Sequence, residues 1–435
     1  MKGLHAGWYL VIGFVALAPV GVRVLTWSKF RLEPIDPEMA RAGQTLFVHE
    51  WKPGDPLSPG GDGLGPVYNA NSCVACHNQG GQGGAGGIEH NVTTFISRPM
   101  SPGCQTNQPQ VVREGVIHSQ AWDGFQETLS HADSQLPATR PFPAQIVPLP
   151  GMERSRVAMP SGTHVSQRNT PALFGANLID AIPDRVIIAN ERKERLKWGL
   201  VPTKSEDLPA GRALRLADGR VGHFGWKAQS ASLSAFVQAA CANELGLGNP
   251  GQAQPQPLGK PFYRPAGLDL TQQQCDQITA FVASLPRPVE RLPEPGMGRE
   301  RVFAGKRLFE RVGCADCHTP NVGGVEGLYS DLLLHDMGQE LVGGGSYNDP
   351  PRPSVPDRNP DGTPGDGPQP GEWRTPPLWG VADSAPYLHD GRALTLEQAI
   401  EMHGGQATRS ARQFAELGKN EQTYLVMFLR TLRAP

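Results

Sequence analysis

The chain has little net charge and no long run of charge of one sign. Its 435 residues include 40 lysines and arginines against 42 aspartates and glutamates, which gives a net charge of −2. Without a basic run or stripe, the sequence offers no binding surface for nucleic acid, and we expect none as a partner. The length allows two or three domains, each with its own core.

The sequence also lacks an apolar run long enough to be a full membrane span by itself. Its most apolar stretch, Gly7–Val22, follows Lys2 and precedes Arg23. The stretch is short for a spanning helix and long for the core of a cleaved export signal, and no small-x-small cleavage site follows it closely. We expect residues 1–30 to be a signal sequence or, by preference, a membrane anchor over residues 7–27. The body would then be periplasmic or otherwise extracytoplasmic.

Cysteines are few, and most of them belong to two C-x-x-C-H motifs. Four of the seven lie at 73–76 and 314–317. Two thiols at this spacing can both add to the vinyl groups of one porphyrin, and the next histidine then lies beneath the iron as its proximal ligand. A zinc site or a redox C-x-x-C would leave both histidines unexplained. We therefore predict two covalently attached haem c groups, held by Cys73, Cys76 and His77 and by Cys314, Cys317 and His318.

The other three cysteines are less informative. Cys241 and Cys275 flank a loop rich in Pro, Gly and Gln. In an oxidising compartment they would form a disulfide, and otherwise they would be two separate buried thiols. No role is assigned to Cys104.

The sequence around the two motifs is repeated. Four segments have amphipathic helical spacing, one before each motif and one closing each half: 37–51, 274–285, 298–312 and 421–432. This is the plan of a small cytochrome c domain, present twice. Glycine and proline, 52 and 42 residues, indicate loops around large cofactors. We predict a mainly α, loop-rich fold of two tandem cytochrome c-like domains, 37–285 and 298–435, joined by a linker at 286–297.

Several stretches lie outside this plan. The first half carries extra material, the Pro-rich Leu136–Pro160 and the charged Asp184–Lys204. In the second half, Tyr347–Gly371 is so rich in Pro, Gly and Asp that we expect a surface excursion.

Motifs in both halves resemble those of bacterial dihaem cytochrome c peroxidases. The resemblance is most specific to the di-haem oxidoreductase branch, and rests on Arg168–Pro171, Leu332–Gly338, Glu372–Gly380, Ala385–Arg392 and Thr395–Ile400. It implies one haem for electron entry and another that reacts with peroxide. It further implies a small soluble electron donor, of cytochrome c or cupredoxin type, and allows a calcium ion, Ca2+, between the domains.

For the second haem, the distal ligand should come from a loop before the closing helix. His403 lies where the resembling peroxidases place an axial methionine, and Met402 and Met337 are alternatives. His403 would otherwise be a surface residue that caps the preceding helix. The choice matters because His/His ligation gives a lower reduction potential than His/Met.

For the first haem, the repeat gives no distal ligand, because the position equivalent to His403 is Ala240. The iron is then open on its distal side or ligated from another loop. The resemblance places a displaceable histidine shortly before the Arg-Asn-x-Pro motif, where His164 occurs. His90 and His223 are competitors.

Cleavage of a peroxide bond needs an acid/base to move a proton between the oxygens. Glu244 resembles the distal glutamate of the peroxidases, although it could be a solvated carboxylate at a helix end. The family's partner glutamine has no clear counterpart, since Phe236 is nearest to its place and Gln238 lies close by.

Four further residues are candidates around the haems. Trp226 matches the inter-haem tryptophan of the family, either as an electron relay or as a core aromatic against porphyrin. His389 is its counterpart in the repeat and should line the second haem. Arg168 and Arg392 could pair with haem propionates.

The leading hypothesis is an exported dihaem enzyme that takes electrons at the second haem and reduces peroxide at the first. An alternative keeps the fold but oxidises another substrate, including a protein side chain or a thiol. A different class is a membrane-tethered dihaem electron carrier. That carrier needs two firm distal ligands, and the sequence offers a good candidate for one haem only.

Overall fold

The computed structural model describes residues 32–97, 111–125, 163–199, 208–257, 260, 262–345, 347, 352–353 and 367–435. The expected signal or anchor, Cys104 and the Pro-rich segment 136–160 lie outside these residues. In the described ranges, no helix is long and apolar enough to cross a membrane.

The helices are α1 (Pro37–Val48), α2 (Cys73–Cys76), α4 (Ala176–Asp180), α5 (Asp184–Gly199), α6 (Leu233–Leu245), α7 (Gln272–Ser284), α8 (Met297–Arg311), α9 (Leu396–Glu401), α10 (Thr408–Ala415) and α11 (Lys419–Leu429). The strands used below are β1 (Val67–Tyr68), β2 (Val92–Ser97), β3 (Val111–Ile117), β5 (Thr163–Arg168), β6 (Val289–Glu290), β9 (Leu334–Asp336), β10 (Arg352–Pro353) and β12 (Leu432–Arg433). All four segments predicted as amphipathic helices are helical, as α1, α7, α8 and α11, with α1 and α11 ending slightly before the predicted residues.

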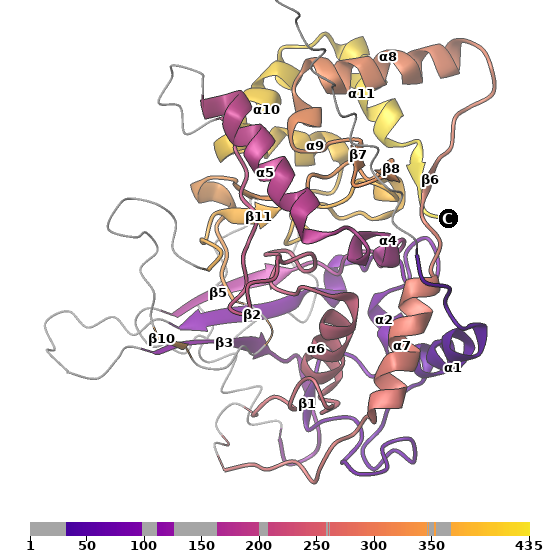
Figure 1. The fold of residues 1–435 in the computed structure, drawn as a ribbon, viewed down its shortest axis with the longest axis vertical. Coiled ribbons are helices and arrows are strands. Elements are labelled where there is room, and N and C mark those ends of the chain that lie inside the picture. The colour runs from indigo at the N-terminus through magenta and orange to yellow at the C-terminus, as the bar shows by residue number, and fades with distance from the viewer. Residues whose placement is uncertain are drawn as a thin grey trace, which may run out of the picture.

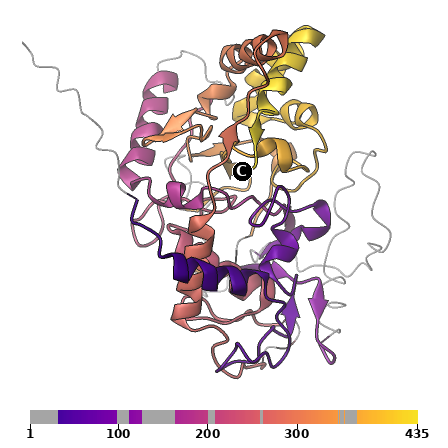
Figure 2. The ribbon, with the colours of Figure 1, turned by 90° about the vertical axis from the view of Figure 1, so that its right-hand side faces the viewer.

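The same helix crossing organises each half. In the first half α1 crosses α7, which Figure 2 shows most clearly, and in the second α8 crosses α11 (Figure 1). A Cβ added to Gly43 would lie 1.8 Å from the carbonyl oxygen of Gln277. A Cβ added to Gly305 would lie 1.8 Å from that of Tyr424. Each crossing therefore requires glycine at its closest point, because no side chain fits between the backbones.

Aromatic packing repeats around the crossings. The rings of Phe47 and Phe281 have centroids 4.9 Å apart, and those of Phe309 and Phe428 are 5.4 Å apart. All four rings are buried. The apolar residues whose spacing predicted these helices are thus the residues that pack α1 against α7 and α8 against α11.

The first half also contains a four-stranded antiparallel sheet in the order β10-β3-β2-β5. The sequence analysis did not predict it, so the fold is mixed rather than mainly α, although loop-rich as expected. Strand β10 comes from the segment predicted to be a surface excursion, and it pairs with β3 through Arg352 opposite Val112. The segment therefore returns to the body of the first half.

The two halves share contacts far apart in sequence. Helix α5, from the charged stretch of the first half, lies beside the second half (Figure 1). There Lys197 forms an ion pair with Asp316, and Asn190 donates a 3.2 Å hydrogen bond to the Asp331 carbonyl. The larger hydrophobic core includes residues of both halves, among them Leu328.

The segment predicted as a linker also has defined structure. Its β6 pairs with β12 at the end of the chain, with Val289 opposite Arg433 and Glu290 opposite Leu432. The interhalf segment is thus fixed to the closing residues of the second half.

Candidate haem-binding and active site

The second motif lies at the end of α8, beside a large cavity. Cys314, Cys317 and His318 line this cavity of about 300 Å³. His318 Nδ1 lies 3.0 Å from the carbonyl oxygen of Tyr329, and its ring centroid lies 6.4 Å from that of Phe309. Burial and the neighbouring His403 ring lower the pKa of His318 to about 4, so the imidazole is neutral. A neutral histidine held through Nδ1 has Nε2 available to bind iron.

His403 follows α9 and lines the same cavity. Its Nδ1 lies 2.6 Å from the carbonyl oxygen of Ala399, and burial lowers its pKa. His403 is therefore not a solvated surface residue, and its Nε2 is available in the same way as that of His318. Of the alternative ligands, Met337 also lines the cavity, whereas Met402 caps α9.

An arginine that the sequence analysis did not single out has an unpaired atom in this cavity wall. Arg374 Nε donates a 2.9 Å hydrogen bond to the carbonyl oxygen of Gly225, but its buried Nη1 has no hydrogen-bond partner among the described residues. Burial lowers the pKa of Arg374 to about 10. A buried guanidinium nitrogen without a partner suits an anionic group such as a haem propionate. Together with the two cysteines and the neutral histidines, it makes the cavity a fit for haem.

The first motif is built in the same way. Cys73 and Cys76 delimit α2, and His77 follows with Nδ1 3.1 Å from the carbonyl oxygen of Gly84. The His77 ring centroid lies 6.3 Å from that of Phe47, as His318 lies against Phe309 in the second half. Burial lowers the pKa of His77 to about 4.

The motif cysteines are neutral thiols in this structure. Burial raises the pKa values of Cys73 and Cys76 to about 12, and it raises that of Cys314 to about 12. No other cysteine stands next to a histidine in the chain. The residues of both motifs are consistent with the haem attachment predicted from their spacing.

Glu244 is the acidic residue beside the first motif. It lies in α6 near Cys76, close enough for its carboxylate to disfavour the Cys76 thiolate. Oε2 accepts a 2.7 Å hydrogen bond from Asn69 Nδ2, while Oε1 is buried and has no partner among the described residues. Burial raises the pKa of Glu244 to about 7, and hydrogen bonds from Asn69 and Tyr347 oppose that rise. Glu244 is thus not a solvated carboxylate at a helix end, and it can take up or release a proton near neutral pH.

The end of α6 is held in place by residues absent from the predicted site. His118 Nε2 lies 2.8 Å from the carbonyl oxygen of Asn243, and the amide of Asn69 donates to the carbonyl of Glu244 at 2.7 Å. Both partners come from segments more than a hundred positions away in the chain. No local sequence signal could have identified them.

Trp226 lies in the wall of the cavity that contains His318. Its indole Nε1 donates a 2.9 Å hydrogen bond to the carbonyl oxygen of Asn169. Phe236 and Pro171 of the first half line the same cavity, and Pro171 lies near the His77 ring. A continuous cavity therefore joins the second motif to residues that contact the first.

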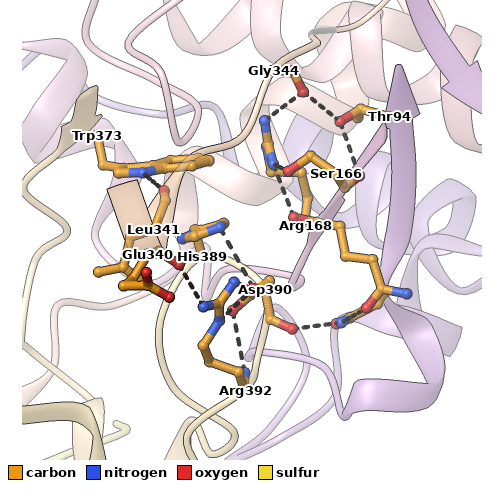
Figure 3. Close-up of polar contacts among 12 residues, drawn as sticks. Thr94, Ser166, Arg168, Glu340, Leu341, Gly344, Trp373, His389, Asp390 and Arg392 are labelled. Atoms are coloured by element: carbon orange, nitrogen blue, oxygen red, sulfur yellow. Dashed lines mark hydrogen bonds and ion pairs between the residues drawn. The ribbon is translucent and has the colours of Figure 1, made fainter. Parts of the chain in front are cut away.

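His389 also lines the cavity, and its ring stacks on Trp373 with centroids 3.7 Å apart and an angle of 14° (Figure 3). Arg168 and Lys227 cover Trp373, at 4.6 and 3.7 Å from the ring centroid. Burial and the cations Arg168, Arg392 and Lys227 lower the pKa of His389 well below its usual value. His389 is a neutral aromatic group in the cavity wall.

The two predicted propionate partners are occupied by protein groups. Arg168 donates to the carbonyl oxygen of Gly344 at 2.8 Å, and Arg392 donates to the Asp390 carboxylate at 2.7 Å and to the Glu340 carbonyl at 2.7 Å (Figure 3). Their roles toward haem stay predictions. The cavity wall offers Arg374, whose Nη1 has no partner within the described ranges.

The candidate distal histidines of the first haem have different positions. His164 lies in β5 opposite Ile96, and its side chain lies outside the described part of the structure. His90 Nε2 lies 3.7 Å from Glu89. His223 is buried, with Nδ1 3.3 Å from the Ile179 carbonyl and Nε2 3.1 Å from Asp184, so both of its nitrogens are engaged.

The structure contradicts the expected disulfide. Cys241 and Cys275 are free thiols, buried in the core where α6 packs on α7. Burial raises the pKa of both thiols. They act as small apolar core residues, which was the alternative interpretation.

A buried polar cluster lies next to Cys317. The Cys317 thiol, the Asp331 carboxylate and the His335 ring offer ligand atoms within 4.8 Å of one another. His335 Nε2 lies 2.9 Å from Asp331 Oδ2, and Glu194 of α5 lies 4.0 Å from the same nitrogen. Burial and the Asp331 carboxylate raise the pKa of Glu194 to about 8. His335 stood in a motif that carried the family resemblance, but the sequence did not indicate its partners.

A family model described as "Di-haem oxidoreductase, putative peroxidase" matches residues 154–432, and the chain belongs to this family. No curated protein matches the chain.

Two solved structures are similar to it at low identity. Hydrazine synthase of Kuenenia stuttgartiensis is 17% identical over 99% of this chain and 100% of that one, with a TM-score of 0.41. A MauG-like protein associated with microbial copper homeostasis is 20% identical over 37% of this chain and 52% of that one, with a TM-score of 0.24. Both TM-scores are low, and neither structure informs the reaction.

Proposed function

We propose that the chain is a dihaem enzyme that reduces a peroxide at the haem of Cys73 and Cys76, with electrons that enter at the haem of Cys314 and Cys317. Membership of the di-haem oxidoreductase family supports an oxidoreductase. The observation that carries the finer proposal is Glu244. It is a buried carboxyl beside Cys76, with a pKa near 7 and one oxygen that has no partner in the described part of the chain.

Each residue has a separate part in this proposal. Bound haem supplies one-electron redox chemistry and, where a coordination position is open, peroxide activation. His77 and His318, each held by a backbone carbonyl, would offer a neutral Nε2 as an iron ligand. Glu244 accepts a proton from one peroxide oxygen and returns it to the other. Trp226 provides an aromatic group in the cavity wall for electron transfer.

The second haem is proposed to be closed by two histidines. His318 and His403 line one cavity, and both rings are oriented by hydrogen bonds from Nδ1 to main-chain carbonyls. This suits an iron that exchanges electrons without binding substrate. A pure electron carrier would need the same closure at the first haem, where His223 has both nitrogens engaged.

Compartment and partners follow from the motifs and are part of the proposal. The two C-x-x-C-H motifs and the apolar N-terminal stretch support an exported protein with its redox partner outside the cytoplasm. A small soluble electron donor suits an enzyme with a dedicated electron-entry haem.

The test is Glu244→Gln, with Glu401→Gln as the matched control on an exposed helix end. The carboxyl variant should lose about 10²- to 10⁴-fold in peroxide-dependent oxidation of a reduced donor. The wild-type pH profile should show an ionisation near 7 that the variant lacks, while haem content stays the same. A variant with the wild-type rate and pH profile would exclude Glu244 as the acid/base, and a wild type inert to peroxide would exclude the function.

A further inference from the structure

A segment of the second half crosses to the sheet of the first. Arg168 Nη2 and Thr94 Oγ1 donate to the carbonyl oxygen of Gly344 at 2.8 and 3.0 Å (Figure 3). A Cβ on Gly344 would lie 2.4 Å from Ile96, so the segment fits closely against β2. Arg168 thereby fixes a backbone that belongs to the other half of the chain.

Tyr347 lies at the end of this segment, three residues after Gly344. Its ring stacks on Phe236 of α6, with centroids 6.2 Å apart and an angle of 26°. Its phenol approaches the Glu244 carboxylate and lies near Cys76. Tyr347 was predicted to begin a surface excursion, but it lies against the first motif.

The surroundings keep Tyr347 a neutral hydrogen-bond donor. Burial and the Glu244 carboxylate raise the pKa of its phenol well above the usual value. Asn69 donates to Glu244 Oε2 and the Tyr347 phenol also donates to this carboxylate, while Oε1 is buried without a partner among the described residues. The pair places a hydroxyl donor next to an acid/base, and Glu244 Oε1 remains available to a small ligand. Phe236, on which the Tyr347 ring stacks, also lines the cavity that contains His318.

We propose that Tyr347 is a positioning residue at the first haem, where its hydroxyl turns from the Glu244 carboxylate to donate its hydrogen bond to a bound small anion or peroxide while Glu244 moves the proton. This inference rests on the proposed function. No covalent step is assigned to Tyr347, and its hydroxyl keeps its proton throughout.

The test uses fluoride, a small anionic haem ligand whose binding depends on nearby hydrogen-bond donors. Ferric and half-reduced dihaem protein is titrated with sodium fluoride and followed by absorption and EPR. Tyr347→Phe, which removes only the hydroxyl, should weaken fluoride binding about tenfold or more. Tyr424→Phe, on α11 of the second half, should bind fluoride like the wild type. Haem content and circular dichroism establish that both variants are folded.

The outcomes separate this inference from the function on which it rests. Fluoride binding of wild-type strength in Tyr347→Phe would overturn the role of Tyr347 and leave a peroxide-reactive haem in place. Tighter binding in the variant would mean that Tyr347 blocks or ligates the iron, which also overturns the proposal. A wild type in which neither haem binds fluoride in either redox state would overturn the proposed function and this inference together.

Discussion

Substituting alanine for Gly305 should loosen the helix crossing that supports the second motif. The new Cβ would lie 1.8 Å from the Tyr424 carbonyl oxygen, where carbon and oxygen normally stay about 3.3 Å or more apart. The helices must then separate by about 1.5 Å, which forfeits much of the contact energy between them. Overpacking of this kind costs about 3 kcal/mol, and alanine returns up to about 1 kcal/mol through helix propensity.

The net loss of about 2 kcal/mol should lower the midpoint of thermal unfolding by several degrees, measured by circular dichroism. Gly298→Ala in the same helix is the matched control. A Cβ there would meet only Pro293 at 3.9 Å, an ordinary contact, so the variant should be as stable as the wild type or slightly more stable. If Gly305→Ala proved as stable as Gly298→Ala, the close crossing of α8 and α11 would be refuted.

Further predictions concern the second motif and its surroundings. Glu194→Gln should raise thermal stability above pH 8 and change it little near pH 4. A carboxyl whose pKa is raised to about 8 in the folded state costs stability as pH rises from its unfolded value to that pKa. Equal effects at both pH values would contradict this. Arg374→Met should lower the reduction potential of the second haem, because a buried cation favours the reduced iron, and an unchanged potential in redox titration would exclude Arg374 from the haem site. His403→Met should raise the same potential, since thioether ligation favours ferrous iron. No shift would point to Met337 as the ligand.

The helices could be predicted from the sequence because their signals are local. Gly43, Phe47, Gly305 and Phe309 occur at equal spacing in α1 and α8, and the same periodicity that marks an amphipathic helix selects the face that packs. The C-x-x-C-H motifs are equally local. Their histidines are held by the carbonyls of Gly84 and Tyr329, which follow later in the same half.

The sheet and the surroundings of Glu244 could not be predicted in this way. Strand β10 pairs with β3 across more than two hundred positions, and nothing in either segment specifies the other. The same is true of Tyr347, which begins a stretch rich in Pro, Gly and Asp that predicted a surface excursion. Its burial depends on Arg168 and Thr94, which anchor the preceding backbone. The pKa of Glu244 depends in turn on such distant partners.

The position of α5 makes each half of the chain depend on the other for its packing. Two halves built on one helix crossing are typical of an internal duplication, and a fresh duplicate can still be cut back to a single unit. Here Glu194 and Lys197 of the first half contact His335 and Asp316 of the second, and Leu328 is buried in a core that both halves build. Deleting either half would uncover apolar surface and leave buried charges without partners. Neither half is therefore expected to fold by itself after a simple deletion, and the two motifs depend on each other's half for stability.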